Sequence, residues 1–181
     1  MRHFLLVLCC VLIPFVLCAQ NSYPVDKGNY VLGGSASFSS LGGEELRGED
    51  RAFVFIFNPV FLYFVAPNIS LGGTITYQSV SQGDYSDSII GLGPSAVYFF
   101  GDENSTTYPF LGVSYIYTSD EDSYTKNDIR LMGGAAFMVA KNVAITGDVF
   151  YLIESYTRED ADDSLSGNTL GIEFGVSAFI F

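Results

Sequence analysis

The sequence has no tryptophan, a single histidine and three cysteines, and all four of these scarce residues stand in its first eighteen positions. Residues 1–19 are predicted to be a secretory signal peptide, because a basic start at Arg2 precedes an apolar run of 14 residues that ends near Ala19. Cleavage there removes every cysteine and histidine. Disulfides, thiol nucleophiles, zinc-thiolate sites and histidine-dependent catalytic triads are then excluded.

Two other interpretations of this leader are weaker. The apolar run contains Pro14 and is shorter than the roughly 20 residues that a membrane-spanning helix needs. A lipoprotein attachment at Cys18 would want a small residue just before the cysteine, and Leu17 stands there.

The rest of the chain has no long apolar run, although 49% of the sequence is hydrophobic. Its longest apolar stretch, residues 52–66, is interrupted by Asn58 and Pro59. Strands of about 9 to 11 residues are enough to cross a membrane when they close into a barrel. The apolar content is therefore predicted to be spread over many short strands.

The last strand length, residues 169–181, alternates between two kinds of side chain and ends on Phe181. This alternation is typical of a barrel strand with lipid on one side and a narrow lumen on the other. The apolar face consists of Leu170, Ile172, Phe174, Val176, Ala178 and Ile180, and the small or polar face of Thr169, Gly171, Glu173, Gly175 and Ser177.

An internal repeat predicts the number of strands. Residues 65–73 (VAPNISLGG) and 139–147 (VAKNVAITG) share one pattern, which predicts two tight hairpins with Asn68 or Asn142 at positive φ. The two turns lie 74 residues apart, an interval that holds four strands. The fold is predicted to be an all-β, eight-stranded antiparallel up-and-down transmembrane β-barrel over 29–181, after a short segment at 20–28.

The predicted strands are 29–40, 51–65, 69–80, 88–100, 108–118, 127–140, 143–156 and 168–181. Pro59 and Pro94 predict bulges or kinks, because each removes a ladder hydrogen bond. The second strand is apolar on both faces, so Phe61 or Phe64 is a candidate to fill the lumen. The aromatic residues expected in interfacial girdles are Tyr63, Phe64, Tyr98, Phe99, Phe100, Tyr117 and Tyr156.

Connection lengths predict the orientation. The connections at 66–68 and 141–142 are minimal and the one at 101–107 is moderate, and all three are assigned to the periplasm with both termini. The connections near 41–50, 80–87, 119–126 and 157–167 are longer and polar and are assigned to the outside. The long connections carry thirteen of the twenty acidic residues. They could bind divalent cations or select charged partners, or simply be solvated. Scarce basic residues argue against nucleic acid.

Four segments together resemble the small outer membrane protein beta-barrel domain family, often labelled porin family: residues 63–72, 91–100 and 137–147 and the terminal strand. The resemblance covers about 28–181 and implies an eight-stranded relative, in architecture, of OmpX, OmpW and the OmpA barrel. It also implies the outer membrane of a Gram-negative-type bacterium as the location. The partners that it implies are outer-membrane lipid and lipopolysaccharide, periplasmic chaperones and the barrel-assembly machinery.

Four charged residues are expected to point into the lumen: Asp128, Arg130, Asp148 and Glu173. Unpaired buried charge is costly, so these groups should pair. They would form either a structural plug of salt bridges or a gate for small solutes or ions. A third interpretation, acid–base catalysis by Asp148 and Glu173, has no further catalytic group to support it.

The sequence thus predicts a monomeric, non-enzymatic outer-membrane barrel with no cofactor and no metal, and with a structural or surface-interaction role. The alternative is a narrow channel or transporter for ions or small, possibly apolar, solutes. A soluble lipocalin-like binder would need the apolar face inside, which the serine, glycine and threonine of the small face oppose.

Overall fold

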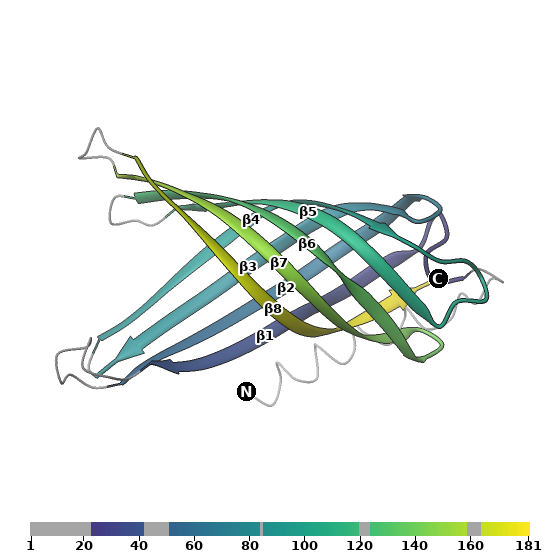
Figure 1. Ribbon diagram of the computed structural model, residues 1–181, viewed down its shortest axis with the longest axis horizontal. Helices are drawn as coiled ribbons and strands as arrows, with labels where there is room; N and C mark the ends of the chain where they lie inside the picture. Colours follow the sequence, from purple (N-terminus) through teal and green to yellow (C-terminus); the bar gives the residue numbers. More distant parts are fainter. Residues whose placement is uncertain (1–22, 42–50, 84, 120–123, 159–163) are drawn as a thin grey trace, which may run out of the picture.

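The computed structural model describes residues 23–41, 51–83, 85–119, 124–158 and 164–181. The predicted signal peptide lies outside the described residues. Each strand pairs antiparallel with the next, and β1 pairs with β8 to close the barrel (Figure 1). The predicted fold class is confirmed. The strands are β1 (Tyr30–Leu41), β2 (Ala52–Ala66), β3 (Ile69–Gln82), β4 (Tyr85–Phe99), β5 (Thr107–Ser119), β6 (Tyr124–Ala140), β7 (Val143–Arg158) and β8 (Ser164–Ile180).

The two repeat segments form equivalent hairpins, β2–β3 and β6–β7, with four strands between their turns. Each hairpin has a register shift at the same place, between Phe64 and Ala66 in one and between Met138 and Ala140 in the other. Asn68 has a φ of 70°, as predicted, and is the only non-glycine residue of the described chain with positive φ. The prediction was wrong for Asn142, whose turn lacks the proline that precedes Asn68 and closes without a left-handed residue.

The prolines interrupt the hydrogen-bonded ladders, but the pairing register is the same on both sides of each proline. Asn58 and Pro59 form no ladder pair with β3, yet Phe57↔Tyr77 and Val60↔Thr74 keep one register across them. Pro94 pairs with Gly73 in β3 and interrupts only the β4–β5 ladder. The predicted bulges at the prolines are therefore wrong. A missing N–H removes one hydrogen bond, and the neighbouring pairs hold the strands in line.

The strand ends at which β1 meets β2, β3 meets β4, β5 meets β6 and β7 meets β8 in sequence lie at one end of the barrel, the long-connection end (Figure 1). The two hairpin turns, the 100–106 connection and the C-terminus lie at the other, the short-turn end. The prediction of a long connection at 80–87 was wrong, because β3 and β4 pair as far as Gln82↔Tyr85. β3 and β4 instead continue beyond the apolar band of the outer wall, with polar residues on alternating faces.

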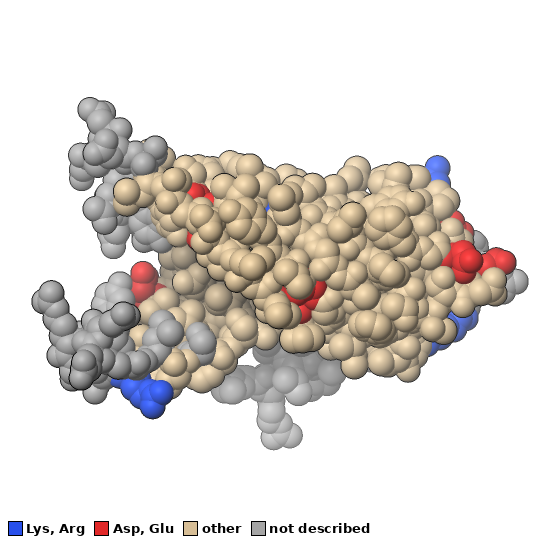
Figure 2. All heavy atoms as spheres, in the orientation of Figure 1, with Lys and Arg blue, Asp and Glu red and all other residues tan. Residues whose placement is uncertain are grey.

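The outer wall is apolar, and Figure 2 shows its charged atoms mostly at the two ends. The apolar face predicted for the last strand is confirmed, with Leu170, Ile172, Phe174 and Val176 exposed on the outer wall. Phe61 also faces outward, while Phe64 is fully buried inside. The girdle assignment was wrong for Phe64, Phe99 and Tyr156, which face the lumen: the first two are buried in a ring cluster, and the Tyr156 hydroxyl donates to an inward carboxylate. Among the described residues no helix is long and apolar enough to cross a membrane.

The β1–β8 ladder is short. It comprises six pairs, from Tyr30↔Ile180 to Ser35↔Gly175. β1 nevertheless pairs with β2 up to Leu41, and β8 pairs with β7 back to Ser164. Beyond Ser35 and Gly175 the two strands diverge toward the long-connection end (Figure 1).

Candidate functional site in the barrel lumen

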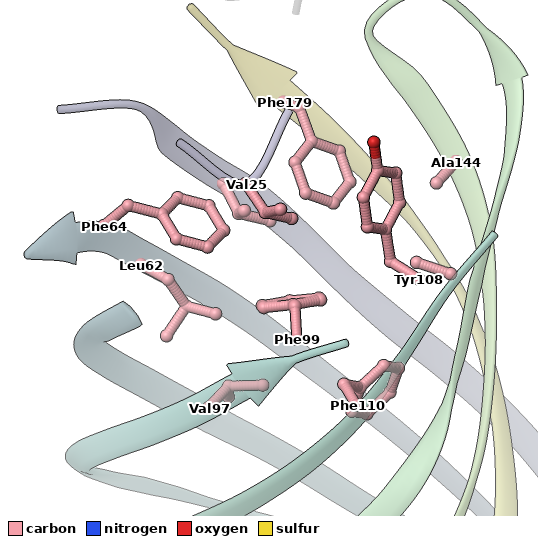
Figure 3. Packing of buried hydrophobic residues seen from close by; sticks show 11 residues of the cluster. Val25, Leu62, Phe64, Val97, Phe99, Tyr108, Phe110, Ala144 and Phe179 are labelled. Atoms are coloured by element: carbon pink, nitrogen blue, oxygen red, sulfur yellow. The ribbon is translucent and has the colours of Figure 1, made fainter. Parts of the chain in front are cut away.

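An apolar cluster fills the lumen at the short-turn end (Figure 3). Seven of its members are at most 2% exposed, and the rings of Phe64, Phe99, Phe110, Tyr108 and Phe179 form a chain of contacts with centroids 5.5 to 6.5 Å apart. Such a packed cluster leaves no aqueous path along the axis at this level. We call it the apolar plug. Its buried members are Val25, Val31, Leu62, Phe64, Val97, Phe99, Tyr108, Phe110, Ala136, Ala144 and Phe179.

The segment before β1, residues 23–29, completes the plug from outside the sheet. Val25 is fully buried among the rings, and its carbonyl accepts the Asn68 amide at 2.8 Å. The Gly28 amide donates to the Phe64 carbonyl at 2.9 Å, and the Asn29 carbonyl accepts the Phe64 amide at 2.9 Å. The segment is therefore fastened to the end of β2 and covers the short-turn mouth. Burial first, and nearby carboxylates second, raise the pKa of the Tyr23 hydroxyl.

Above the plug lies a cavity of about 110 Å³ with two kinds of wall. Its apolar side is the inner surface of the plug, including Val97, Phe99 and Phe110. Its polar side includes Asn58 and Arg130. The Asn58 Oδ1 acceptor and the Arg130 Nε donor are buried and have no hydrogen-bond partner among the described residues. The cavity therefore has room and polar atoms for a few water molecules or a small polar solute.

Arg130, on β6, forms an ion triad with Asp148 on β7 and Glu173 on β8. The Arg130 Nη2 atom lies 3.4 Å from Asp148 Oδ1 and also contacts Glu173 Oε2. The guanidinium carbon sits 4.2 Å from the centroid of the Phe150 ring. All three charged side chains are 12 to 14% exposed. A delocalised cation between a ring and two carboxylates suits Arg better than Lys.

Glu173 links the triad to the far side of the seam. Its Oε1 atom accepts hydrogen bonds from Asn58 Nδ2 at 2.8 Å and from the Ser35 hydroxyl. Ser35 is in the last pair of the β1–β8 ladder. Glu173 therefore joins β8 to β1 and β2 where the ladder ends.

A second triad lies on β6 and β7, nearer the long-connection end. Lys126 Nζ is 2.9 Å from Asp128 Oδ2 and 2.7 Å from Glu154 Oε1. The Tyr156 hydroxyl and the Thr169 hydroxyl also donate to Glu154, at 2.9 and 3.0 Å. Asp128 Oδ1 is buried without a partner among the described residues. Each triad carries one positive and two negative groups.

The structure places all four sequence-predicted residues inside the barrel but divides them between the triads. Arg130, Asp148 and Glu173 meet, whereas Asp128 pairs with Lys126. Sequence reasoning missed Lys126 and Glu154, although both share the strand parity of the residues it chose. The predicted sixth strand began at residue 127, one position too late to include Lys126.

The carboxylates are engaged by cations. Asp148 and Glu173 both contact one guanidinium, that of Arg130. Among the described residues no group of three or more His, Cys, Asp and Glu side chains could hold a metal ion. In the part of the chain that the structure describes, the lumen thus offers paired charges and a small amphipathic cavity.

The lumen and its eight-stranded wall have known counterparts. The family described as "Outer membrane protein beta-barrel domain" matches residues 9–177. The chain belongs to the outer membrane protein beta-barrel family. Among solved structures, this barrel is similar to that of Neisserial surface protein A, with a TM-score of 0.53 and 20% identity over 86% of this chain and 98% of that one. A comparison with curated proteins gives no significant match.

Family membership confirms the resemblance inferred from residues 63–72, 91–100 and 137–147, and indicates an outer-membrane location for this barrel. At 20% identity, the likeness to Neisserial surface protein A concerns the fold alone.

Proposed function

We propose that this barrel is a non-enzymatic, non-conducting outer-membrane protein that acts at the cell surface through its long acidic connections. The observation that carries this proposal is the apolar plug. With Val25, Phe64 and Tyr108 fully buried at one end, water and ions have no continuous path through the lumen. The function then resides outside the lumen.

The proposal includes an orientation, with the termini and short turns in the periplasm and the acidic connections outside. Most acidic residues of the connections lie outside the described residues, but their sequence positions join strand ends on one side of the barrel. A negative surface of this kind favours cationic partners, or divalent ions that bridge it to anionic lipopolysaccharide. An epitope inserted at 159–163 should be accessible to antibody on intact cells. One inserted at 102–105 should become accessible only after the outer membrane is permeabilised, and the reverse result would contradict the orientation.

A non-enzymatic role agrees with the chemistry of the lumen. Asp148 and Glu173, the carboxylates weighed as an acid–base pair, contact the same Arg130 side chain. This sharing makes them structural counter-ions. The signal peptide, if cleaved as predicted, removes the thiols and the imidazole that alternative mechanisms would use.

Single-channel conductance of the refolded mature chain in a planar bilayer tests the proposal. We expect a properly folded barrel, identified by heat-modifiable gel migration, to be silent. Truncating the plug with Tyr108→Ala and Phe179→Ala should produce discrete openings, whereas the lipid-facing Tyr98→Ala should not. Reproducible openings of the unsubstituted chain would refute the non-conducting assignment.

The cavity favours the second candidate, a narrow transporter. Its unpartnered Asn58 Oδ1 and Arg130 Nε atoms could hold a small polar solute next to apolar walls. Transport would require the plug to move, so solute flux in liposomes should rise when Val25 is replaced by Gly. Flux that is already present in the unsubstituted protein would favour this candidate over the first.

A further inference from the structure

Two arms of the wall, residues 36–41 of β1 and 164–174 of β8, have a strand edge that pairs with no strand among the described residues; residues 85–90 of β4 likewise form no pair with β5 there. Past Ser35↔Gly175, no further β1–β8 pair forms among the described residues, although β1 runs on to Leu41 and β8 begins at Ser164. Both arms are fully laddered on their other side, by β2 and by β7. Each arm is therefore the edge of a sheet, paired on one side only. Figure 2 shows the molecular surface hollowed between the two arms toward the long-connection end.

These open edges lie at the level of lipid. The lipid-facing side chains of β8 beside the open edge are Leu170, Ile172 and Phe174, and they are 70 to 72% exposed. Six paired residues rise only about 16 Å along the axis at a strand tilt of about 40°. The apolar band of such a barrel is about 25 Å tall. The band therefore extends past the last pair.

Lipid hydrocarbon cannot form hydrogen bonds with the unpaired backbone groups of a strand edge. Every backbone N–H and C=O in the membrane core needs a hydrogen-bond partner, which is why membrane-spanning sheets close. The unpaired parts, residues 36–41 of β1 and 164–174 of β8, present such groups toward the gap. An acyl chain would cover the apolar side chains but would leave the backbone groups unpaired.

We propose that a second copy of this chain pairs with the open edges, so that β1 of each copy forms a ladder with β8 of the other. A two-fold axis parallel to the barrel axis keeps both copies in the same membrane orientation. Such an axis brings the β1 arm of one barrel against the β8 arm of its partner in antiparallel fashion. Two identical seams then form at once, and each pairs the β1 arm of one copy with the β8 arm of the other. This inference is independent of the proposed surface function.

The register of the existing ladder supports this arrangement, because it can continue between copies without a change of face. The six remaining pairs would run from 36↔174 to 41↔169, which extends the observed Ser35↔Gly175 register. In these pairs Phe38 would meet Ile172 on the lipid face, and Ser40 would meet Leu170. The same side chains that face lipid in the single barrel would face lipid in the pair.

Thiol cross-linking tests the proposal. In full-length protein with Cys9, Cys10 and Cys18 replaced by Ala, differently tagged Ser40→Cys and Leu170→Cys chains are co-expressed and treated in membranes with a short bis-maleimide. Both original side chains are exposed, so the substitutions should not disturb folding. We expect a covalent heterodimer. The matched control combines Ser40→Cys with Leu92→Cys, because Leu92 is similarly exposed at 63% but has partners on both sides, Ile75 and Tyr117. This control should give at least tenfold less dimer.

A double variant, Ser40→Cys with Leu170→Cys in one chain, separates the alternatives. An internal cross-link without dimer would show that the seam closes within one barrel and would overturn the proposal. An absence of any cross-link would show that lipid or water faces the edges, and would overturn it as well. As a second measurement, sedimentation of the unsubstituted protein in detergent should give the mass of two chains, and a monomer at all protein concentrations would contradict the proposal.

Discussion

Removal of the Arg130 side chain should destabilise the barrel strongly, because Arg130 is the cation that compensates two lumen carboxylates. Asp148 has no other ion-pair partner among the described residues, whereas Glu173 would keep its hydrogen bonds from Ser35 and Asn58. Arg130→Ala therefore leaves one carboxylate orphaned and a second one partly satisfied. The substitution also removes the contact with the Phe150 ring.

The expected magnitude follows from the burial of the triad. Removing one partner of a buried ion pair typically costs about 3 to 5 kcal/mol. Because these side chains are 12 to 14% exposed and some water can reach them, we expect about 3 kcal/mol for Arg130→Ala. Asp148→Asn alone should cost about 1 kcal/mol, since it removes a charge but leaves a polar group of similar shape.

The double variant provides the decisive comparison. If the orphaned Asp148 carboxylate causes most of the loss, Arg130→Ala combined with Asp148→Asn should be more stable than Arg130→Ala alone by about 1 kcal/mol or more. The assay is urea unfolding in lipid vesicles, followed by heat-modifiable gel migration and circular dichroism, because the chain has no tryptophan. Strict additivity of the two substitutions would refute the ion-triad explanation. A loss of unfolding free energy below about 0.5 kcal/mol for Arg130→Ala would also refute the ion-triad explanation, because substitutions of surface residues have effects of that size.

Three further predictions concern the turns, the glycines and the plug. Asn68→Ala should cost about 1 kcal/mol in unfolding free energy because its φ is 70°, whereas Asn142→Ala at the equivalent turn should be nearly neutral; the same urea assay compares them. Gly72→Ala should prevent refolding, since a Cβ there would lie 1.9 Å from a backbone oxygen, and Gly73→Ala, with its nearest atom at 3.4 Å, should refold normally, as gel migration will show. Tyr108→Phe should cost about 1 kcal/mol by loss of a 3.1 Å hydrogen bond to a backbone carbonyl and should leave the barrel non-conducting in planar bilayers.

The parts of the fold that could be predicted from the sequence are those encoded by the alternation of side chains along a strand and by the internal repeat. Residues 65–73 and 139–147 give two equivalent hairpins, and their separation gives the strand number, because antiparallel neighbours need few residues to connect. Strand alternation also gives the correct face for Asp128, Arg130 and Asp148. These features depend on local order along the chain.

The parts that were missed depend on the height of a residue along the barrel axis. The alternation of inward and outward side chains along a strand does not encode this height. Phe99 has inward parity, yet it was assigned to a girdle because aromatic residues at strand ends fit either place, and Phe64 was named for both a girdle and the lumen, where it lies. Val25 precedes the first strand, and no local pattern indicates that it enters the lumen. Lys126 was missed because it was assigned to the connection 119–126, although β6 continues through it. Glu154 lay within the predicted strand 143–156 and was not chosen, although it shares the parity of Asp148.

The residues of β1 and β8 differ between the end of the barrel where these strands pair, which is filled by the plug, and the end where they separate. Where β1 and β8 pair, their inward residues Val31 and Phe179 belong to the plug, so separating the strands there would expose packed apolar surface. Beyond the last pair, the first inward residue of β8 is Glu173, which bonds back to Ser35, and the inward positions that follow hold Ser37, Gly171 and Thr169, which bury little. Separating the strands at this level loses mainly backbone hydrogen bonds. The same two strands of a second copy would form those backbone hydrogen bonds again.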